Sequence, residues 1–194
     1  MPNDLFKNRF RIPSARAQWH HYNGGMYFVT ICTAGREHFF GEITNSEMRL
    51  SAIGEYTRQC IENTSQHTKY AQVPLYVIMP NHLHLIVIID DAQLVETCHG
   101  ASLHANHGES LQWRVSSEGK NQKMQDVANH QGRLSAVIGL FKQSVTRHAN
   151  ANNIPFAWQT RFHDHIIRHT DEINHFAEYI QNNVAKWDTD EFNV

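Results

Sequence analysis

The pattern of apolar and polar positions predicts a β-hairpin near the middle of the chain. Two apolar runs, residues 73–79 and 83–89, are separated by Pro80-Asn81. Proline supplies the fixed φ of a turn's first central position, and asparagine tolerates a positive φ at the next position. Because side chains alternate faces along a strand, the second run places four side chains on one face: His82, His84, Ile86 and Ile88.

Further elements follow from the same rules of alternation and helical spacing. Apolar, β-branched segments predict strands over residues 26–33, 39–43 and 161–168. Apolar stripes predict a helix from Asn45 or Ser46 to Thr64 and another over residues 134–149. A final helix begins at Thr170, a good N-cap. This order of elements suits an α+β fold, a ferredoxin-like sandwich with helices packed on an antiparallel sheet.

A polar segment interrupts this pattern. From Asp90 to about Arg133 the chain is rich in Ser, Asn, Gln, Gly and His and has no sustained periodicity. Such a long irregular segment is unusual inside a compact domain. We interpret residues 91–133 as a mobile insertion, or alternatively as a flap that faces a substrate or partner. The remainder forms one domain over residues 1–194, with residues 1–22 as a basic N-terminal arm.

Composition narrows the class of protein. The chain has 194 residues, of which 41% are hydrophobic and 19% charged, as expected of a globular protein with one sizeable core. No apolar run is long enough to cross a membrane, and the three cysteines are scattered, which is typical of a reducing compartment. We therefore expect a cytoplasmic protein.

The charge distribution leaves two interpretations of the N-terminal arm open. A net charge of −2 argues against a protein that coats duplex DNA through bulk electrostatics. The first 18 residues are nevertheless basic, with Lys7, Arg9, Arg11 and Arg16 against Asp4. This segment is either a solvated arm or a contact for nucleic acid.

Two histidines at the head of an apolar strand are the first candidate site. The Cα atoms of His82 and His84 should lie roughly 7 Å apart, so both rings can converge on one ion. A single histidine here would be a satisfied, half-buried side chain. A pair inside a strand that is apolar on both faces requires a metal, an anion or water. A second pair, His163 and His165, flanks Asp164 between arginines and fits an edge position, where hydrogen bonding to a phosphate or to a ligand is the expected role.

The final helix carries the second candidate site. Its apolar stripe consists of Ile173, Phe176, Ala177, Ile180, Val184 and Trp187. Tyr179 and Asn183 lie one turn apart on the polar shoulder beside this stripe, together with His175 and Lys186. From spacing alone, a tyrosine in this place is a packing residue with its hydroxyl in water.

Two motifs resemble those of a known family. The run Met79-Pro80-Asn81-His82-Leu83-His84-Leu85 closely resembles the His-hydrophobe-His signature of the HUH single-tyrosine transposases, in particular the REP-associated tyrosine transposase branch. The run from Tyr179 to Lys186 resembles that family's Tyr-Ile-x-x-Asn-Pro-x-Lys, with Val184 in place of the proline. Shorter matches lie in residues 27–30, 158–159 and 164–168, so the resemblance covers most of the chain apart from the insertion and the last residues.

The resemblance implies an HUH endonuclease fold and an enzyme that cleaves single-stranded DNA. Tyr179 would be the nucleophile and would form a 5′-phosphotyrosine adduct, leaving a free 3′-hydroxyl. His82, His84 and Asn183 would hold a divalent cation, Mg²⁺ or Mn²⁺, because nitrogen and neutral oxygen ligands suit these ions better than a closed zinc site. The implied partners are single-stranded or hairpin DNA of REP type, and a homodimer is a further hypothesis.

The remaining candidate residues concern recognition. Candidates for DNA contacts are Arg9, Arg11, Arg16, Trp19, Lys142, Arg161, Arg168 and Lys186. His165 and Asp164 are candidates for hydrogen bonds to the residues that would bind the cation.

Two other functions remain open from the sequence. One is a domesticated protein that binds hairpin DNA without cutting it, although the presence of His82, His84 and Tyr179 together argues against this. The other is a small metal-dependent or histidine-based phosphohydrolase acting on nucleotides. A histidine-triad enzyme would need a third histidine at the position of Ile86.

Overall fold

The computed structural model describes residues 5–6, 9–10, 20, 22–90 and 122–193, with the backbone alone for residues 5–6, 9–10 and 122–131. Four strands form the main sheet: β3 (Gly25–Cys32), β6 (Ala71–Ile78), β7 (His82–Ile89) and β8 (His163–Ile167). All neighbours are antiparallel and the order is β6-β7-β3-β8. With α1 (Ala52–Glu62) after β3 and α3 (Gln122–Ala151) after β7, this is the predicted ferredoxin-like α+β sandwich.

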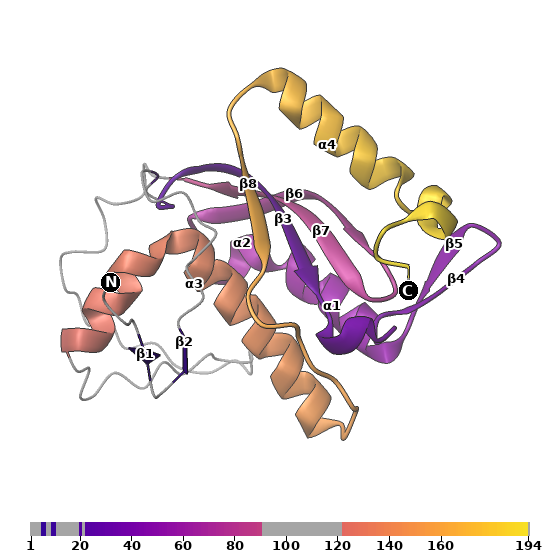
Figure 1. The fold of residues 1–194 in the computed structure, drawn as a ribbon, viewed down its shortest axis with the longest axis horizontal. Helices are drawn as coiled ribbons and strands as arrows, with labels where there is room; N and C mark the ends of the chain where they lie inside the picture. The colour runs from indigo at the N-terminus through magenta and orange to yellow at the C-terminus, as the bar shows by residue number, and fades with distance from the viewer. Residues whose placement is uncertain (1–4, 7–8, 11–19, 21, 91–121, 194) are drawn as a thin grey trace, which may run out of the picture.

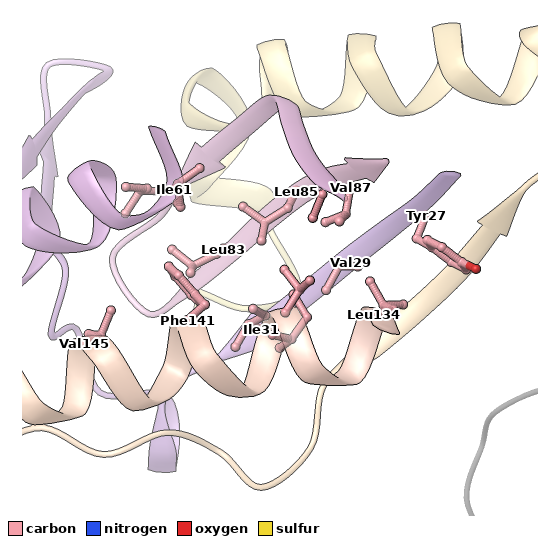
Figure 2. Close-up of a cluster of buried hydrophobic side chains, with 14 of the residues drawn as sticks. Tyr27, Val29, Ile31, Ile61, Leu83, Leu85, Val87, Leu134, Phe141 and Val145 are labelled. Atoms are coloured by element: carbon pink, nitrogen blue, oxygen red, sulfur yellow. The ribbon is translucent and has the colours of Figure 1, made fainter. Parts of the chain in front are cut away.

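Helices cover both faces of the sheet, with α3 on one side and α4 (Thr170–Asn182) on the other (Figure 1). The main core lies between the sheet and the helices α1 and α3, where β3 and β7 contribute every second side chain. Figure 2 shows this cluster, in which Leu83, Leu85 and Val87 of β7 point toward Leu134 and Phe141 of α3. The alternation predicted for β7 is therefore confirmed on this face.

A second, smaller core lies under α4. It joins Ile86 and Ile167 of the sheet to Ile180, with Ile173 and Phe176 packed against them. The apolar stripe predicted for the final helix is thus correct for these three α4 residues. Its last two members, Val184 and Trp187, belong instead to the 3₁₀ helix η3 (Val184–Thr189), because α4 ends at Asn182.

The region between β3 and α1 differs from the prediction. The expected strand over residues 39–43 is β4 (Gly41–Thr44), and it pairs with an unpredicted strand, β5 (Glu47–Leu50). Asn45 and Ser46, expected to begin a helix, have φ of 54° and 61° and form the hairpin turn. Two consecutive residues with positive φ match the twist of the flanking strands. Helix α1 therefore begins later, with Ser51 as its N-cap.

The helices also differ from the prediction in several places. Helix α3 begins at Gln122, so the irregular insertion ends well before Arg133, and its remaining residues, 91–121, lie outside the described chain. The helix breaks at Gly132 (φ 69°), where a Cβ would lie 2.6 Å from Cβ of Tyr22. A short helix, α2 (Thr64–His67), follows α1. In α4 the N-cap is His169 rather than Thr170, and the Glu172 carboxylate accepts from the Arg168 amide just outside the helix.

Three short elements complete the fold. The strands β1 (Leu5–Phe6) and β2 (Arg9–Phe10) pair within the N-terminal arm, and the 3₁₀ helix η1 (Ala34–Arg36) follows β3. No helix within the described residues combines the length and the apolar character needed to span a bilayer.

Candidate functional site

His82 and His84 lie next to each other on the sheet face that α4 covers. His82 is the first residue of β7, and His84 is paired with Thr30 of β3. Their ring centroids are 4.6 Å apart, and the side chains are buried, with 0% and 2% exposure. The two imidazoles therefore share one face, as the alternation predicts, and neither is the half-exposed side chain that a lone histidine would be.

Each imidazole uses its Nδ1 atom within the protein. Nδ1 of His82 lies 2.8 Å from Oδ1 of Asn81, and Nδ1 of His84 lies 2.9 Å from Oγ1 of Thr30. The two Nε2 atoms differ. That of His84 lies 3.3 Å from the Tyr179 hydroxyl, whereas that of His82 is buried and has no hydrogen-bond partner. A buried nitrogen without a partner is unfavourable in a folded protein unless a ligand satisfies it.

Helix α4 brings Tyr179 and Asn183 to the histidines. Tyr179 is partly buried, and its ring lies 5.0 Å from that of His84 and 6.0 Å from that of Phe28. Asn183 caps the helix with helical angles, φ −62° and ψ −46°, so it stays on the side of the helix that carries Tyr179. Its Nδ2 donates to Asp190, while its Oδ1 is buried without a partner.

Burial sets the protonation state of the site. It lowers the pKa of His82 to about 2, with smaller contributions from His84 and Arg36, and it lowers the pKa of His84 to about 4. Burial, followed by the carboxylate of Asp190, raises the pKa of the Tyr179 phenol. At neutral pH both imidazoles are therefore neutral, as metal binding requires, and the phenol keeps its proton.

These pKa values predict how stability depends on pH. An unfolded histidine titrates near pH 6.5, so below that pH the unfolded chain binds protons that the folded site rejects. The contribution of these two histidines to stability should be constant above pH 6.5 and should fall by up to about 1.4 kcal/mol per pH unit per histidine as the pH drops toward 4. Urea unfolding between pH 7 and pH 5 measures this. The His82→Gln/His84→Gln variant should show a shallower dependence, and an equal slope in both proteins would contradict the prediction.

The C-terminal segment covers the histidines. The ring of Phe192 lies 4.4 Å from that of His82, and the ring of Trp187 lies 6.1 Å from it. The Arg36 guanidinium sits 4.4 Å above the Phe192 ring and donates to the Glu191 carbonyl. A pocket of about 260 Å³ is lined by Tyr179, Asn183, Lys186, Thr189, Asp190 and Glu191. Tyr179 is thus reachable from solvent, whereas His82 is enclosed.

The donor atoms fit a small divalent cation. Nε2 of His82 and Oδ1 of Asn183 are both buried and unsatisfied, and Nε2 of His84 is engaged only by the Tyr179 hydroxyl. Within the described part of the chain, no three side chains of His, Cys, Asp or Glu cluster so that they could hold a metal ion. The set of His82, His84 and Asn183 differs because its third member is an amide. Two imidazole nitrogens and one amide oxygen leave coordination positions open for water or a substrate.

Among the described residues, the basic side chains predicted to contact DNA lie in different places. Lys186 lines the pocket beside Tyr179. Arg161 and Arg168 are exposed at the two ends of β8. Lys142 of α3 instead donates to the carbonyls of Gln159 and Arg161 and lies over the Trp158 ring, so its ammonium group holds the segment before β8.

The described part of the chain does not test the candidate DNA contacts in the N-terminal arm. The backbone of Arg9 lies in β2, and its side chain is not described. Arg11, Arg16 and Trp19 lie outside the described residues. Their contacts to DNA stay predictions.

The second His-x-His pair lies on the edge strand β8, as predicted. Its His165 contacts α4, with Nε2 3.5 Å from a Glu172 carboxylate oxygen and the ring 5.1 Å from that of Phe176. Asp164 is paired with Val29, on the opposite face of the sheet from His84. Neither residue has a contact with His82 or His84 among those described, and their part in the site stays a prediction.

Several residues of the site could not be found from the sequence patterns. Asn81 was expected to serve the turn through a positive φ, but it does not have one, and its buried side chain contacts His82 instead. Thr30 belonged to a motif match without an assigned role. Asp190 and Phe192 follow α4 in a segment without periodicity. Their contacts with Asn183 and His82 are therefore visible only in the folded structure.

Comparison with known proteins identifies a similar fold and a sequence relative. No family model matches the sequence. The structure of a REP-associated tyrosine transposase bound to a REP hairpin aligns with a TM-score of 0.54 and 17% identity, over 90% of this chain and 74% of that one. At this identity the likeness shows a shared fold, in agreement with the fold that the sequence resemblance implies.

A sequence relative is closer. An uncharacterized protein of Haemophilus influenzae is 33% identical over 178 residues, which are 90% of this chain and 89% of that protein. The α+β sandwich thus has the fold of a tyrosine transposase, and the chain belongs to the same protein family as the Haemophilus influenzae protein.

Proposed function

We propose that this protein cleaves and rejoins single-stranded DNA with Tyr179 as the nucleophile and a divalent cation held by His82, His84 and Asn183. One observation carries the proposal. The Tyr179 hydroxyl lies against Nε2 of His84, and the neighbouring His82 and Asn183 each carry a buried polar atom without a partner. A tyrosine hydroxyl beside a histidine nitrogen, together with two buried polar atoms that lack partners, is difficult to explain as packing alone.

The cation would be Mg²⁺ or Mn²⁺. Nitrogen and neutral oxygen donors with open positions suit these ions, and the open positions can accept a phosphate oxygen. When bound, such a cation polarises the scissile phosphate and stabilises the negative charge that develops during cleavage. The protein supplies the ligands already neutral, since burial depresses the pKa of both histidines.

Tyr179 forms the covalent bond in the proposed reaction. Its Oη attacks phosphorus, the bond from phosphorus to the 3′ oxygen breaks, and a 5′-phosphotyrosine and a free 3′-hydroxyl result. The phenolic proton is lost to water, and the 3′ oxygen takes up a proton as it leaves. The reverse reaction restores the phosphodiester without ATP, because the tyrosine ester retains the bond energy.

The substrate class follows from the fold and from the shape of the site. The structural neighbour is bound to a REP hairpin, and we propose hairpin-bearing single-stranded DNA as the partner of this chain. A flexible strand can bend into a site that lies beside a helix end, as a duplex cannot. Lys186, in the pocket beside Tyr179, is positioned to contact a phosphate.

A phosphate can reach the histidines only when the C-terminal segment moves. Phe192 covers His82, and the acidic Asp190 and Glu191 line the pocket. These carboxylates would repel an incoming phosphate. We therefore propose that residues 190–193 are displaced when DNA binds.

The proposal is tested by incubation of the protein with end-labelled, hairpin-bearing single strands and Mn²⁺, followed by a denaturing gel. A labelled band that migrates with the protein and disappears after protease treatment is expected. Duplex DNA of the same sequence is the control and should give no band. Retarded migration on a native gel without any covalent band would support a non-cutting hairpin-binding protein instead.

Asn183 gives a prediction that separates a ligand from a nucleophile. Asn183→Ala removes the amide oxygen, so cleavage at low Mn²⁺ should fall by at least about 10- to 100-fold, the cost of losing only an outer-shell partner of a metal ligand. Raising the Mn²⁺ concentration should restore part of the activity by mass action. A titration of cleavage rate against Mn²⁺ measures the effect. A reduced rate that no Mn²⁺ concentration improves would show that Asn183 does not act through the cation.

A further inference from the structure

The side chain of Asn81, at the tip of the hairpin between β6 and β7, makes three polar contacts. Its side chain is 1% exposed. Nδ2 donates to the carbonyl of Arg36 at 3.2 Å and to the carbonyl of Phe192 at 2.7 Å. Oδ1 lies 2.8 Å from Nδ1 of His82. The side chain therefore joins η1, the hairpin and the C-terminal segment at one point.

These contacts determine which way the amide points. Carbonyl oxygens only accept hydrogen bonds, so the group that faces both carbonyls must be the NH₂. The reversed amide would place its oxygen against two carbonyl oxygens and leave all three without a proton between them. The group that faces His82 is consequently the amide oxygen.

The orientation of Asn81 in turn determines the tautomer of His82. An amide oxygen can only accept, so Nδ1 of His82 must carry the proton. A neutral imidazole has one such proton, and Nε2 is left with a lone pair. This Nε2 is the buried nitrogen that has no hydrogen-bond partner in the protein.

We propose that Asn81 is a positioning residue that holds His82 in the Nδ1–H tautomer with Nε2 directed toward a bound cation. The inference rests on the proposed function for the identity of the ligand, whereas the tautomer itself is a property of the protein without metal. Partners of this kind fix the orientation of metal-binding histidines and increase the basicity of the donor nitrogen. Asn81 thus acts on the site through His82 and touches no reacting atom.

Two variants separate this role from a purely structural one. Asn81→Asp keeps an oxygen that accepts from His82 and removes the donors to Arg36 and Phe192. Asn81→Leu has a similar size and removes both functions. Loss of the structural anchor would affect the two variants alike, whereas loss of the tautomer affects Asn81→Leu alone. Asn152→Leu is the matched control. Asn152 is exposed at the end of α3, and its side-chain amide donates to the His148 carbonyl.

The first readout is the tautomer in metal-free protein, measured by long-range proton–nitrogen correlation NMR with ¹⁵N-labelled histidine. The spectrum of His82→Gln assigns the His82 signals. The wild type, Asn81→Asp and Asn152→Leu should show the proton on Nδ1 of His82, and Asn81→Leu should show it partly or wholly on Nε2. A wild-type proton on Nε2, or an unchanged tautomer in Asn81→Leu, would overturn the inference.

The second readout is the affinity for Mn²⁺ alone, measured from the electron paramagnetic resonance signal of the free ion. Asn81→Leu should bind Mn²⁺ about 10- to 100-fold more weakly than wild type, and Asn81→Asp should bind at least as tightly. Equal weakening in both variants would overturn the inference in favour of a structural anchor. The expected tautomers together with no Mn²⁺ binding by wild type would refute the proposed metal site while supporting the role of Asn81 in orienting His82.

Discussion

The Tyr179→Phe variant should lose covalent attachment to DNA and keep its affinity for hairpin DNA. The substitution removes one oxygen and retains the ring that packs near His84 and Phe28. The rate of adduct formation should fall by at least about 10³-fold, because the oxygen that forms the phosphoester bond in the proposed reaction is removed. Denaturing gels measure the adduct, native gels measure binding, and thermal unfolding should differ little from wild type.

Tyr76→Phe is the matched control for this variant. Tyr76 is also partly buried, and its hydroxyl donates to Glu62 on the opposite side of the sheet from α4. The same atom is removed away from the site, so cleavage should remain at the wild-type rate. Loss of cleavage in both variants would indicate a general effect on folding, and persistence of the adduct in Tyr179→Phe would exclude Tyr179 as the nucleophile.

Removal of either His82 or His84 should abolish cleavage as completely as Tyr179→Phe does. Alanine is a poor choice for this test because His82 and His84 are buried, and a smaller side chain would leave a destabilising cavity. Leucine is close to histidine in size and cannot bind a metal. We therefore expect His82→Leu and His84→Leu to fold and to lose both Mn²⁺ binding and cleavage.

Chelation provides an independent check on the histidine variants. Wild-type protein treated with EDTA should behave as they do, and added Mn²⁺ should restore cleavage in the wild type alone. His67→Leu, at the end of α2 and away from the site, controls for the change from imidazole to leucine. Undiminished cleavage by His82→Leu/His84→Leu in metal-free buffer would exclude the proposed site.

The sheet and the main features of the site could be predicted because they depend on regular periods. A period of two residues places His82 and His84 on one face, and the helical period places Asn183 one turn after Tyr179. These relations hold whatever the rest of the chain does. The helix also ends at Asn182 although Val184 replaces the proline of the family motif.

Other features depend on contacts between distant segments and leave no periodic signal. The turn at Asn45 and Ser46 has the residue types of a helix start, and the local sequence does not reveal that β5 pairs with β4. The contact of Lys142 with DNA stays a prediction, and only the folded chain shows that its ammonium group binds two carbonyls of a segment that follows α3. Phe192 reaches His82 across a long sequence separation, so the closure of the site could only be seen in the folded chain.

The most direct test of the central claim is mass spectrometry of the trapped protein–DNA adduct after digestion. With Tyr179 as the nucleophile, a nucleotide phosphate is expected on the peptide that contains Tyr179, with fragmentation that assigns it to that residue. Tyr22, Tyr27, Tyr56, Tyr70 and Tyr76 are the other tyrosines of the chain and should be unmodified. A phosphate attached to any of them, or an adduct that forms equally in the Tyr179→Phe variant, would contradict the account.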